Sequence, residues 1–215
     1  MIVAIDGPAG SGKGTITKLV AKKCNLTYID TGATYRCVAL ALIEKGIDPN
    51  DENKIIELTK SLKIDFDENG RTFLNGKDVS KRIRDKDVTN VVSPVSSIIK
   101  VREILVELQR KMALGKNVIM EGRDITTVVF PNADFKFYLD ASIDERAKRR
   151  FIQNEENNKK MSYEEIYESI KKRDYNDKNK PVGALKRCND QIYIDSSNLT
   201  IDEVVNIIVE KIGGK

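Results

Sequence analysis

Short apolar runs and longer segments of helical periodicity alternate along this chain. The apolar runs are rich in β-branched and aromatic residues and stop at polar residues, as buried parallel strands do. Between them, apolar residues recur at helical spacing, as Ile16, Leu19 and Val20 do in the segment 13–24. Alternating strands and helices predict an α/β fold, with a five-stranded parallel sheet covered by helices on both faces. The predicted strands are residues 2–5, 27–30, 117–121, 135–140 and 191–195.

Capping residues mark where helices begin. Ser93 precedes Pro94, and proline is favoured at the first helical position, so we expect the longest helix to begin there with Ser93 as its cap. A serine or threonine followed three residues later by glutamate forms a capping box, which starts a helix. Three such boxes occur, at Ser142/Glu145, Ser162/Glu165 and Thr200/Glu203.

Residues 63–80 have a different pattern, in which polar and apolar residues alternate. The segment contains Asn69-Gly70 and Asn75-Gly76, and Asn-Gly between alternating segments is a strong signal for a two-residue hairpin turn. Both central residues of that turn need a positive φ angle. We therefore expect a small antiparallel β insert within the α/β fold.

Composition indicates one globular domain. The 215 residues are 40% hydrophobic and 33% charged, and the apolar run 38–43 is far too short to span a bilayer. No signal peptide is visible, and Cys24, Cys37 and Cys188 are too widely spaced for a disulfide framework. We expect a reduced, cytoplasmic monomer that binds neither membrane nor nucleic acid.

The absence of histidine from the sequence narrows the chemistry. It excludes Ser-His-Asp and Cys-His catalysis, histidine acid–base catalysis and histidine-ligated metals. Residues 142–187 hold thirteen Lys and Arg against nine Asp and Glu, which accounts for the whole net charge of +4. This basic segment is either a solvated helical surface or a region that attracts anions. A non-catalytic basic binding module is therefore one alternative function.

The segment between the first strand and the first helix predicts a phosphate-binding loop. Its glycines allow backbone N–H groups to converge on an anion, and the helix N-terminus adds a favourable dipole. Lys13 would reach the outer phosphates, whereas Gly14 replaces the hydroxyl residue of the G-x-x-x-x-G-K-[ST] motif. No metal-ligating residue is assigned. The alternative is a glycine-rich turn without function. The residues assigned to ATP are Gly7, Pro8, Ala9, Gly10, Ser11, Gly12, Lys13, Gly14 and Thr15.

Gly12-Lys13-Gly14-Thr15 has the form seen in nucleoside monophosphate kinases, and further motifs extend the likeness. These motifs lie at residues 30–36, 121–124 and 173–177. With them, the chain resembles bacterial cytidylate (CMP) kinases nearly end to end. The resemblance implies a P-loop kinase fold and phosphoryl transfer from ATP, with Mg²⁺, to CMP or dCMP. A kinase for UMP or AMP is the alternative. The motifs include Asp30-Thr31-Gly32-Ala33-Thr34-Tyr35-Arg36, Glu121-Gly122-Arg123-Asp124 and Arg173-Asp174-Tyr175-Asn176-Asp177.

The same resemblance divides a single domain, residues 1–215, into functional regions. In kinases of this type a lid closes over the nucleotides, and the polar stretch 153–161 would be its flexible part. The regions are a core at 1–30, 82–150 and 175–215, a monophosphate-binding region at about 31–81 with its β insert at 63–80, and a lid at about 151–174.

Several charged residues lie where an unpaired charge would be costly. Arg102 falls on the apolar stripe of the longest helix, so it needs an anionic partner, unless it extends to the edge of the stripe or pairs with a structural carboxylate. Arg123 and Asp124 follow a strand at the sheet edge where α/β proteins bind ligands, although a strand-end ion pair is the alternative. Tyr28 and Tyr35 are expected in the core. The resemblance assigns CMP binding to Thr31, Arg36, Ser93, Arg102, Arg123, Asp124, Arg173, Asp177 and Lys180.

Phosphoryl transfer needs positive charge around the transferring group rather than a strong base. Arg146 and Arg150 are four residues apart, so they would project from one helix face and grip one polyphosphate. By resemblance, Glu121 would orient a magnesium-bound water, and Lys180 stands where arginine is more frequent. Catalytic roles are expected for Lys13, Arg123, Arg146, Arg150 and Arg173.

Overall fold

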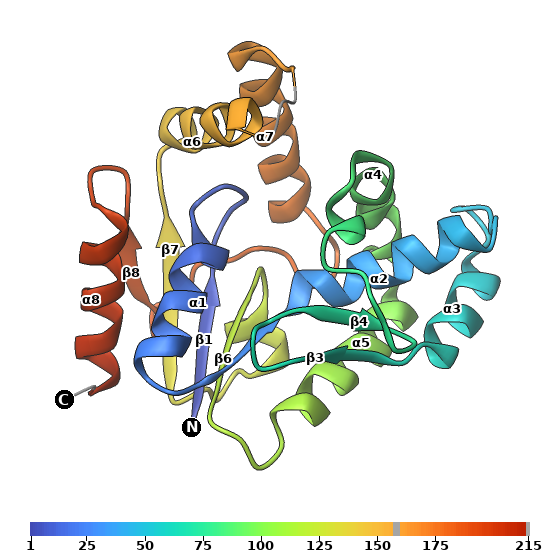
Figure 1. Ribbon diagram of the computed structural model, residues 1–215, viewed down its shortest axis with the longest axis horizontal. Helices are drawn as coiled ribbons and strands as arrows, with labels where there is room; N and C mark the ends of the chain where they lie inside the picture. Colours follow the sequence, from blue (N-terminus) through green and yellow to red (C-terminus); the bar gives the residue numbers. More distant parts are fainter. Residues whose placement is uncertain (157–159, 214–215) are drawn as a thin grey trace.

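The computed structural model describes residues 1–156 and 160–213. Its central sheet consists of β1 (Ile2–Asp6), β2 (Thr27–Asp30), β6 (Val118–Gly122), β7 (Phe135–Asp140) and β8 (Ile192–Asp195). The strand order is β2-β6-β1-β7-β8, and every neighbouring pair is parallel (Figure 1). The predicted α/β fold with five parallel strands is therefore confirmed.

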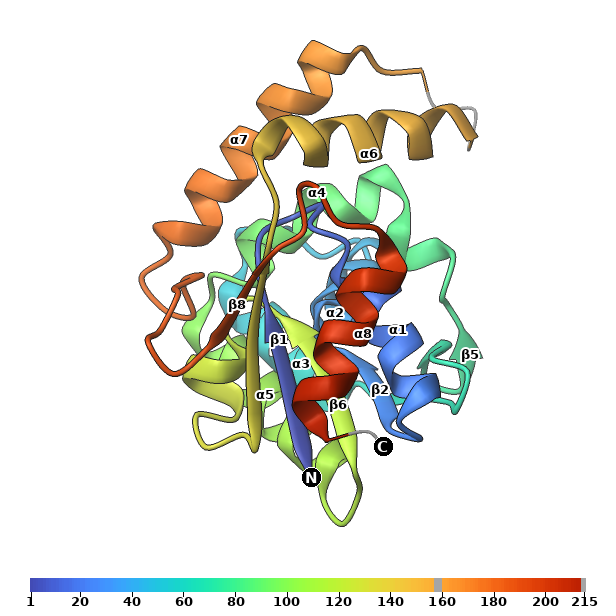
Figure 2. The same cartoon turned by 90° about the vertical axis from the view of Figure 1, so that its left-hand side faces the viewer.

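Helices cover both faces of this sheet because side chains alternate along each strand. On one face, α1 (Lys13–Lys23) and α8 (Ile201–Ile212) bury their apolar sides against β1, β6, β7 and β8 (Figure 2). On the other face lie α5 (Ile99–Ala113) and the π-helical turn η2 (Ile125–Val129). The inner strands β1 and β6 are thus buried on both sides, which explains why they appear in the sequence as nearly continuous apolar runs, whereas the edge strand β8 exposes Tyr193 and Asp195.

A second apolar cluster is built around α2 (Thr31–Glu44), which is buried over most of its length. It packs against α3 (Glu52–Ser61), α4 (Lys86–Val95) and the turn η1 (Arg82–Arg84). Figure 1 shows this group of helices to one side of the sheet. Because neighbours surround α2, the run 38–43 is apolar on every side of the helix.

The β insert is a separate three-stranded antiparallel sheet of β3 (Ile64–Phe66), β4 (Thr72–Leu74) and β5 (Lys77–Asp78). Asn75 and Gly76 join β4 to β5 with φ angles of 50° and 83°, which confirms the predicted hairpin turn.

The other Asn-Gly prediction is wrong. Asn69 is not in the left-handed region; of this pair only Gly70 has a positive φ, of 71°. The connection from β3 to β4 is a five-residue loop, 67–71, which Asp67 organises by accepting hydrogen bonds from the amides of Asn69 and Arg71. A side chain that bonds to its own loop replaces the two-residue turn.

The predicted start of the longest helix is also wrong. Pro94 lies in the last turn of α4, and α5 begins only at Ile99. The helix ends one residue after the proline, and the hydroxyls of Ser96 and Ser97 both donate to the Ser93 carbonyl, which satisfies one of the carbonyls at the helix end. Buried Val95 also anchors this turn in the apolar cluster.

The helices α6 (Ile143–Glu156) and α7 (Tyr163–Lys178) project beyond the carboxyl ends of the strands, as Figures 1 and 2 show. Capping boxes at Ser162 and Thr200 are complete, whereas Ser142 accepts from the Glu145 amide while that glutamate pairs with Arg149 instead. Of the stretch 153–161, residues 153–156 belong to α6, and residues 157–159 lie outside the described residues.

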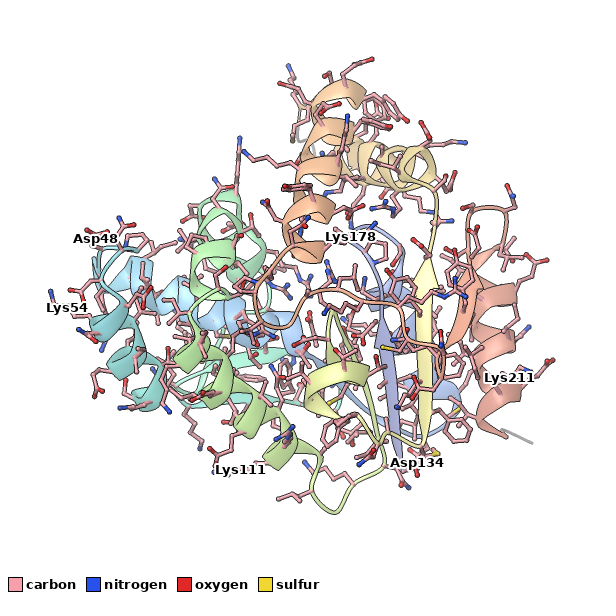
Figure 3. All side chains as sticks on the ribbon, turned by 180° about the vertical axis from the view of Figure 1, so that it is seen from behind. Asp48, Lys54, Lys111, Asp134, Lys178 and Lys211 are labelled. Atoms are coloured by element: carbon pink, nitrogen blue, oxygen red, sulfur yellow. The ribbon has the colours of Figure 1, made fainter. Side chains whose placement is uncertain are left out.

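Charged side chains on the outer faces are well solvated. Figure 3 shows Lys54, Lys111 and Lys211 pointing away from α3, α5 and α8, and the first two side chains are 71% and 65% exposed. Within residues 1–156 and 160–213, no helix is long and apolar enough to span a bilayer. By contrast, several arginines near the carboxyl ends of the strands are largely buried, among them Arg36, Arg102 and Arg146.

Candidate active site

The predicted phosphate-binding loop connects β1 to α1 at the carboxyl edge of the sheet. Lys13 begins α1 and is only 5% exposed. Its Nζ donates to the Pro8 carbonyl at 2.6 Å and to Ser11 Oγ at 3.3 Å. Burial and the nearby charge of Arg123 place the pKa of Lys13 well below its usual value. The loop therefore holds a cation that an anionic ligand would stabilise.

Glu121, at the end of β6, explains why residue 14, which follows Lys13, is a glycine. A Cβ at Gly14 would lie 3.1 Å from Glu121 Oε1, so the carboxylate lies where a side chain would project. The Tyr28 hydroxyl donates to the same oxygen. Tyr28 is buried as expected, but it also reaches the site. Burial and the charge of Asp30 raise the pKa of Glu121, and Lys13 opposes the rise.

Asp30 organises the neighbouring strand end. It caps α2 by accepting from the Ala33 amide at 3.0 Å, and its Oδ2 lies 2.6 Å from Arg36 Nη2 and 3.0 Å from Arg84 Nη2. Burial alone would raise the pKa of Asp30, but the two arginines hold it below its usual value. The Thr31 hydroxyl donates to the Glu121 carbonyl at 2.7 Å. Sequence reasoning missed Arg84, because its polar surroundings have no periodic pattern.

Arg102 and Asp124 form a buried ion pair. Arg102 also donates to the Ser96 carbonyl at 3.2 Å and lies over the Tyr35 ring, 5.4 Å from its centroid. Burial raises the pKa of Asp124, and the guanidinium counteracts this shift. The anionic partner that Arg102 requires is therefore Asp124, a residue that the resemblance also assigns to CMP binding.

Arg123 instead pairs with α7. Its Nε donates to Asp177 Oδ2 at 2.8 Å, and Arg173 Nε lies 4.0 Å from the same oxygen. Lys180 Nζ lies 3.5 Å from the other oxygen of Asp177 and donates to Ser96 Oγ at 2.9 Å. These four predicted residues therefore form one cluster. Ser93 is exposed, and the serine that contacts this cluster is Ser96.

The two arginines expected to act as a pair have different surroundings. Arg146 is buried and donates to the carbonyls of Ala141 and Ala9, at 2.9 and 3.0 Å. Arg150 is exposed and donates to Gln153 at 2.7 Å. Of these two arginines on α6, Arg146 is the one that contacts the phosphate-binding loop.

Asp6 is a second residue that sequence reasoning missed. It is fully buried at the end of β1 and accepts from the amides of Ile125 and Thr126, both at 2.9 Å, and from the Thr126 hydroxyl at 2.7 Å. Asp6 therefore fixes the turn that follows Asp124. Its position directly after an apolar strand is the signal that could have identified it.

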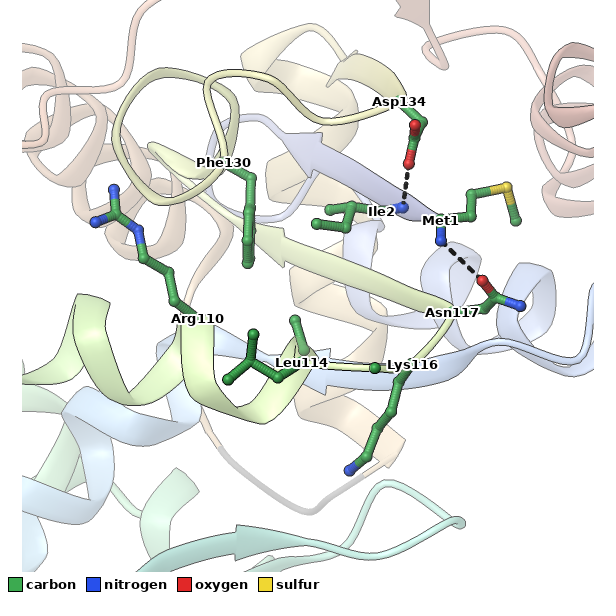
Figure 4. A pocket seen from close by; sticks show the side chains of 10 residues that line it. Met1, Ile2, Arg110, Leu114, Lys116, Asn117, Phe130 and Asp134 are labelled. Atoms are coloured by element: carbon green, nitrogen blue, oxygen red, sulfur yellow. Dashed lines mark hydrogen bonds between the residues drawn. The ribbon is translucent and has the colours of Figure 1, made fainter.

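A shallow pocket of about 490 Å³ lies at the opposite, amino end of the strands (Figure 4). The Met1 ammonium group donates to Asn117 at 2.8 Å and the Ile2 amide to Asp134 at 2.6 Å. Arg110, also at its wall, donates to the carbonyls of Val128 and Val129. These groups tie chain segments together and are remote from the phosphate-binding loop.

A glycine-rich loop with a buried lysine, next to clustered arginines at the carboxyl edge of a parallel sheet, defines a P-loop phosphotransferase. Two solved structures share the fold at 12% identity over nearly the whole chain. They are shikimate kinase from Bacteroides thetaiotaomicron, with a TM-score of 0.52, and an uncharacterised protein from Eubacterium ventriosum, with a TM-score of 0.58.

The particular family is shown by closer relatives. The cytidylate kinase family model matches residues 3–213. Cytidylate kinase of Fusobacterium nucleatum is 49% identical over 212 residues, which cover 99% of this chain and 97% of that one. Cytidylate kinase of Caldanaerobacter subterraneus is 48% identical over 98% of this chain and 93% of that one. The chain belongs to the cytidylate kinase family.

Proposed function

We propose that this protein transfers the terminal phosphoryl group of ATP to CMP and dCMP, giving ADP and CDP or dCDP. The observation that carries the proposal is the buried Arg102–Asp124 pair, close to the Arg123–Asp177–Lys180 cluster. A carboxylate held in place by a guanidinium is an acceptor suited to the amino group of cytosine, which uracil lacks. Membership of the cytidylate kinase family supports the same substrate.

In the reaction, a phosphate oxygen of CMP attacks the terminal phosphorus of ATP while the bond to the bridging oxygen of ADP breaks. The nucleophile is already an anion, so no strong base is required. Charge on the transferring group is met by cations on either side of it. We assign this role to Lys13, Arg123, Arg146, Arg150 and Arg173, and the ATP phosphates to the loop 7–15.

For CMP, we assign the phosphate to Arg36, Arg173 and Lys180, the ribose hydroxyls to Asp177, and the base to Arg102 and Asp124. Arg36 and Arg123 are held by Asp30 and Asp177 respectively, so the orientations of their guanidinium groups are already fixed by carboxylates. Thr31 and Ser93 complete the proposed set, and Ser96 joins it because of its contacts with Arg102 and Lys180.

Mg²⁺ would accompany the ATP phosphates. In such sites magnesium keeps several waters and is bound mainly through phosphate oxygens. Glu121 fits this arrangement, because its carboxylate lies against Gly14 and is fixed by Tyr28. Bound magnesium supplies additional positive charge to the phosphates, and Glu121 would orient one of its waters.

The regional division of the domain is part of the proposal. The α6 and α7 segment would act as the lid over 151–174, with α2, α3 and the β insert at 31–81 holding CMP, and the remainder as core. We further propose that the protein acts in the cytoplasm as a monomer.

The direct test is a comparison of kcat/KM for CMP, dCMP, UMP and AMP at saturating ATP, with the rate measured from the release of ADP. The proposal expects CMP and dCMP to exceed UMP and AMP. Faster turnover of AMP or UMP would assign the site to another monophosphate.

A further inference from the structure

Helix α7 faces two parts of the site at once. Arg173 and Asp177 lie one turn apart: Asp177 pairs with Arg123, and Arg173 Nε lies 4.0 Å from the same Asp177 oxygen. Asp174 lies between them in sequence but faces α6, where its Oδ2 is 2.7 Å from Arg146 Nη2. Asp174 is 9% exposed, and its buried Oδ1 has no hydrogen-bond partner within residues 1–156 and 160–213.

Each guanidinium nitrogen of Arg146 contacts a different segment of the protein. Nε donates to the Ala141 carbonyl just after β7, Nη1 to the Ala9 carbonyl in the phosphate-binding loop, and Nη2 pairs with Asp174. The arginine side chain is only 6% exposed. It also packs against the loop, because a Cβ at Gly10 would lie 3.3 Å from Arg146 Cβ.

We propose that Asp174 is a positioning residue for the ATP side of the reaction. Asp174 balances the buried charge of Arg146 and fixes the guanidinium so that Nη1 holds the Ala9 carbonyl. A buried guanidinium that loses its carboxylate must find another anion or a route to water, and either movement releases the loop. The conformation of residues 7–15 therefore depends on where α7 lies.

This arrangement joins the two substrates through one helix. The proposal rests on the function assigned above, in which residues 173 and 177 contact CMP and the loop binds ATP. CMP that binds Arg173 and Asp177 fixes the position of α7. Through Asp174 and Arg146, that position then determines the conformation of the loop. A two-site coupling of this kind is reciprocal, so ATP bound in the loop favours the same position of α7.

The test compares Asp174→Asn with two matched variants. Asp174→Glu keeps the carboxylate on a longer side chain, and Glu168→Gln removes an exposed α7 carboxylate whose ion pair with Lys171 is 3.6 Å long. Two quantities are measured for each full-length protein. The first is the dissociation constant of each substrate alone, for ATP without CMP and for CMP without ATP, and the second is hydrogen exchange of the amides of residues 7–15 against those of α8.

For Asp174→Asn we expect the dissociation constant of ATP alone to rise about tenfold, the scale of a weakened hydrogen bond to a charged group, while that of CMP alone changes less than about twofold. Exchange should accelerate in residues 7–15 and not in α8. Asp174→Glu should recover part of both effects, and Glu168→Gln should match the original protein. If Asp174→Asn does not fold, Asp174→Glu is compared with Glu168→Gln instead. Faster exchange of residues 7–15 in Asp174→Glu than in Glu168→Gln then supports the inference, and equal exchange overturns it.

Equal exchange in Asp174→Asn and Glu168→Gln, or equal rises in the dissociation constants of ATP alone and CMP alone, would overturn the inference. Because hydrogen exchange needs no substrate, a loop that is released in a protein inactive toward CMP would refute the proposed function and leave the positioning role intact.

Discussion

Gly183 provides a sharp test of how the Arg102–Asp124 pair is held. This residue, in the segment between α7 and β8, has a φ of +66° and lies directly on the pair. A Cβ there would be 1.9 Å from Arg102 Nη2 and 2.6 Å from Asp124 Oδ2. Gly46 is a matched control, because its φ is +60° and nothing lies within 4 Å of its Cβ position.

The magnitude follows from these distances. Either substitution by alanine places a side chain in the left-handed region, at about 1–2 kcal/mol of unfolding free energy. In Gly183→Ala the pair or the segment must also move by roughly 1.5 Å to restore ordinary contact. A shift of that size breaks a charge-assisted hydrogen bond, which costs about 1.5–3 kcal/mol more. The midpoint of thermal unfolding should therefore be about 3–12 °C lower for Gly183→Ala than for Gly46→Ala.

The assay combines thermal unfolding with steady-state kinetics. If the pair binds cytosine, Gly183→Ala should raise KM for CMP about tenfold, equivalent to about 1.4 kcal/mol, with KM for ATP within about twofold. Gly46→Ala should leave both KM values unchanged. The reasoning is refuted if the two variants have the same unfolding midpoint and the same KM for CMP.

Two further predictions concern the ATP side. Lys13→Ala should lower kcat by about tenfold or more, the scale of a lost charge-stabilising donor; unchanged kcat in the folded variant would contradict that role. Tyr28→Phe removes the hydrogen bond that favours ionised Glu121, so the pKa of this carboxyl, already raised by burial, rises further. Ionising Glu121 then costs more in the folded state, and the deficit in unfolding free energy, about 1–3 kcal/mol, should be larger at about pH 8 than at about pH 5. Denaturant unfolding at both pH values checks this, and an equal deficit would show that the hydroxyl does not act through the charge.

The sheet was predictable because most of its strands are short, largely buried apolar runs that end at polar residues. The position of the loop 7–15 between β1 and α1 was predictable for a related reason, since its glycines and lysine follow an apolar strand and precede a helical pattern. Signals of this kind depend on a few adjacent residues. Tertiary contacts have little influence on them.

The start of α5 could not be predicted in the same way. Ser93-Pro94 has the local signature of a helix start, but the burial of Val95 and the hydroxyl bonds to the Ser93 carbonyl make it a helix end. Asn69-Gly70 fails similarly, because the Asp67 side chain bonds to the loop amides in place of a tight turn.

The candidate site was predictable in its residue types and less so in its pairings. Arg102 was known to need an anion, yet only the fold brings Asp124 beside it, 22 residues away. Asp174 lies inside a motif that sequence reasoning used for its neighbours, and nothing in its spacing shows that it faces Arg146. Pairings across elements depend on how α5, α6 and α7 are oriented, which spacing along the chain does not encode.

Recognition of the cytosine amino group by Asp124 is the central claim, and the most direct measurement is the ratio of kcat/KM for CMP to that for UMP. The original protein should favour CMP by at least about tenfold, because a buried acceptor left unpaired by uracil is costly. In Asp124→Asn, which replaces the carboxylate with an amide, the ratio should fall toward one. A ratio near one in the original protein, or one that Asp124→Asn leaves unchanged, would contradict the account.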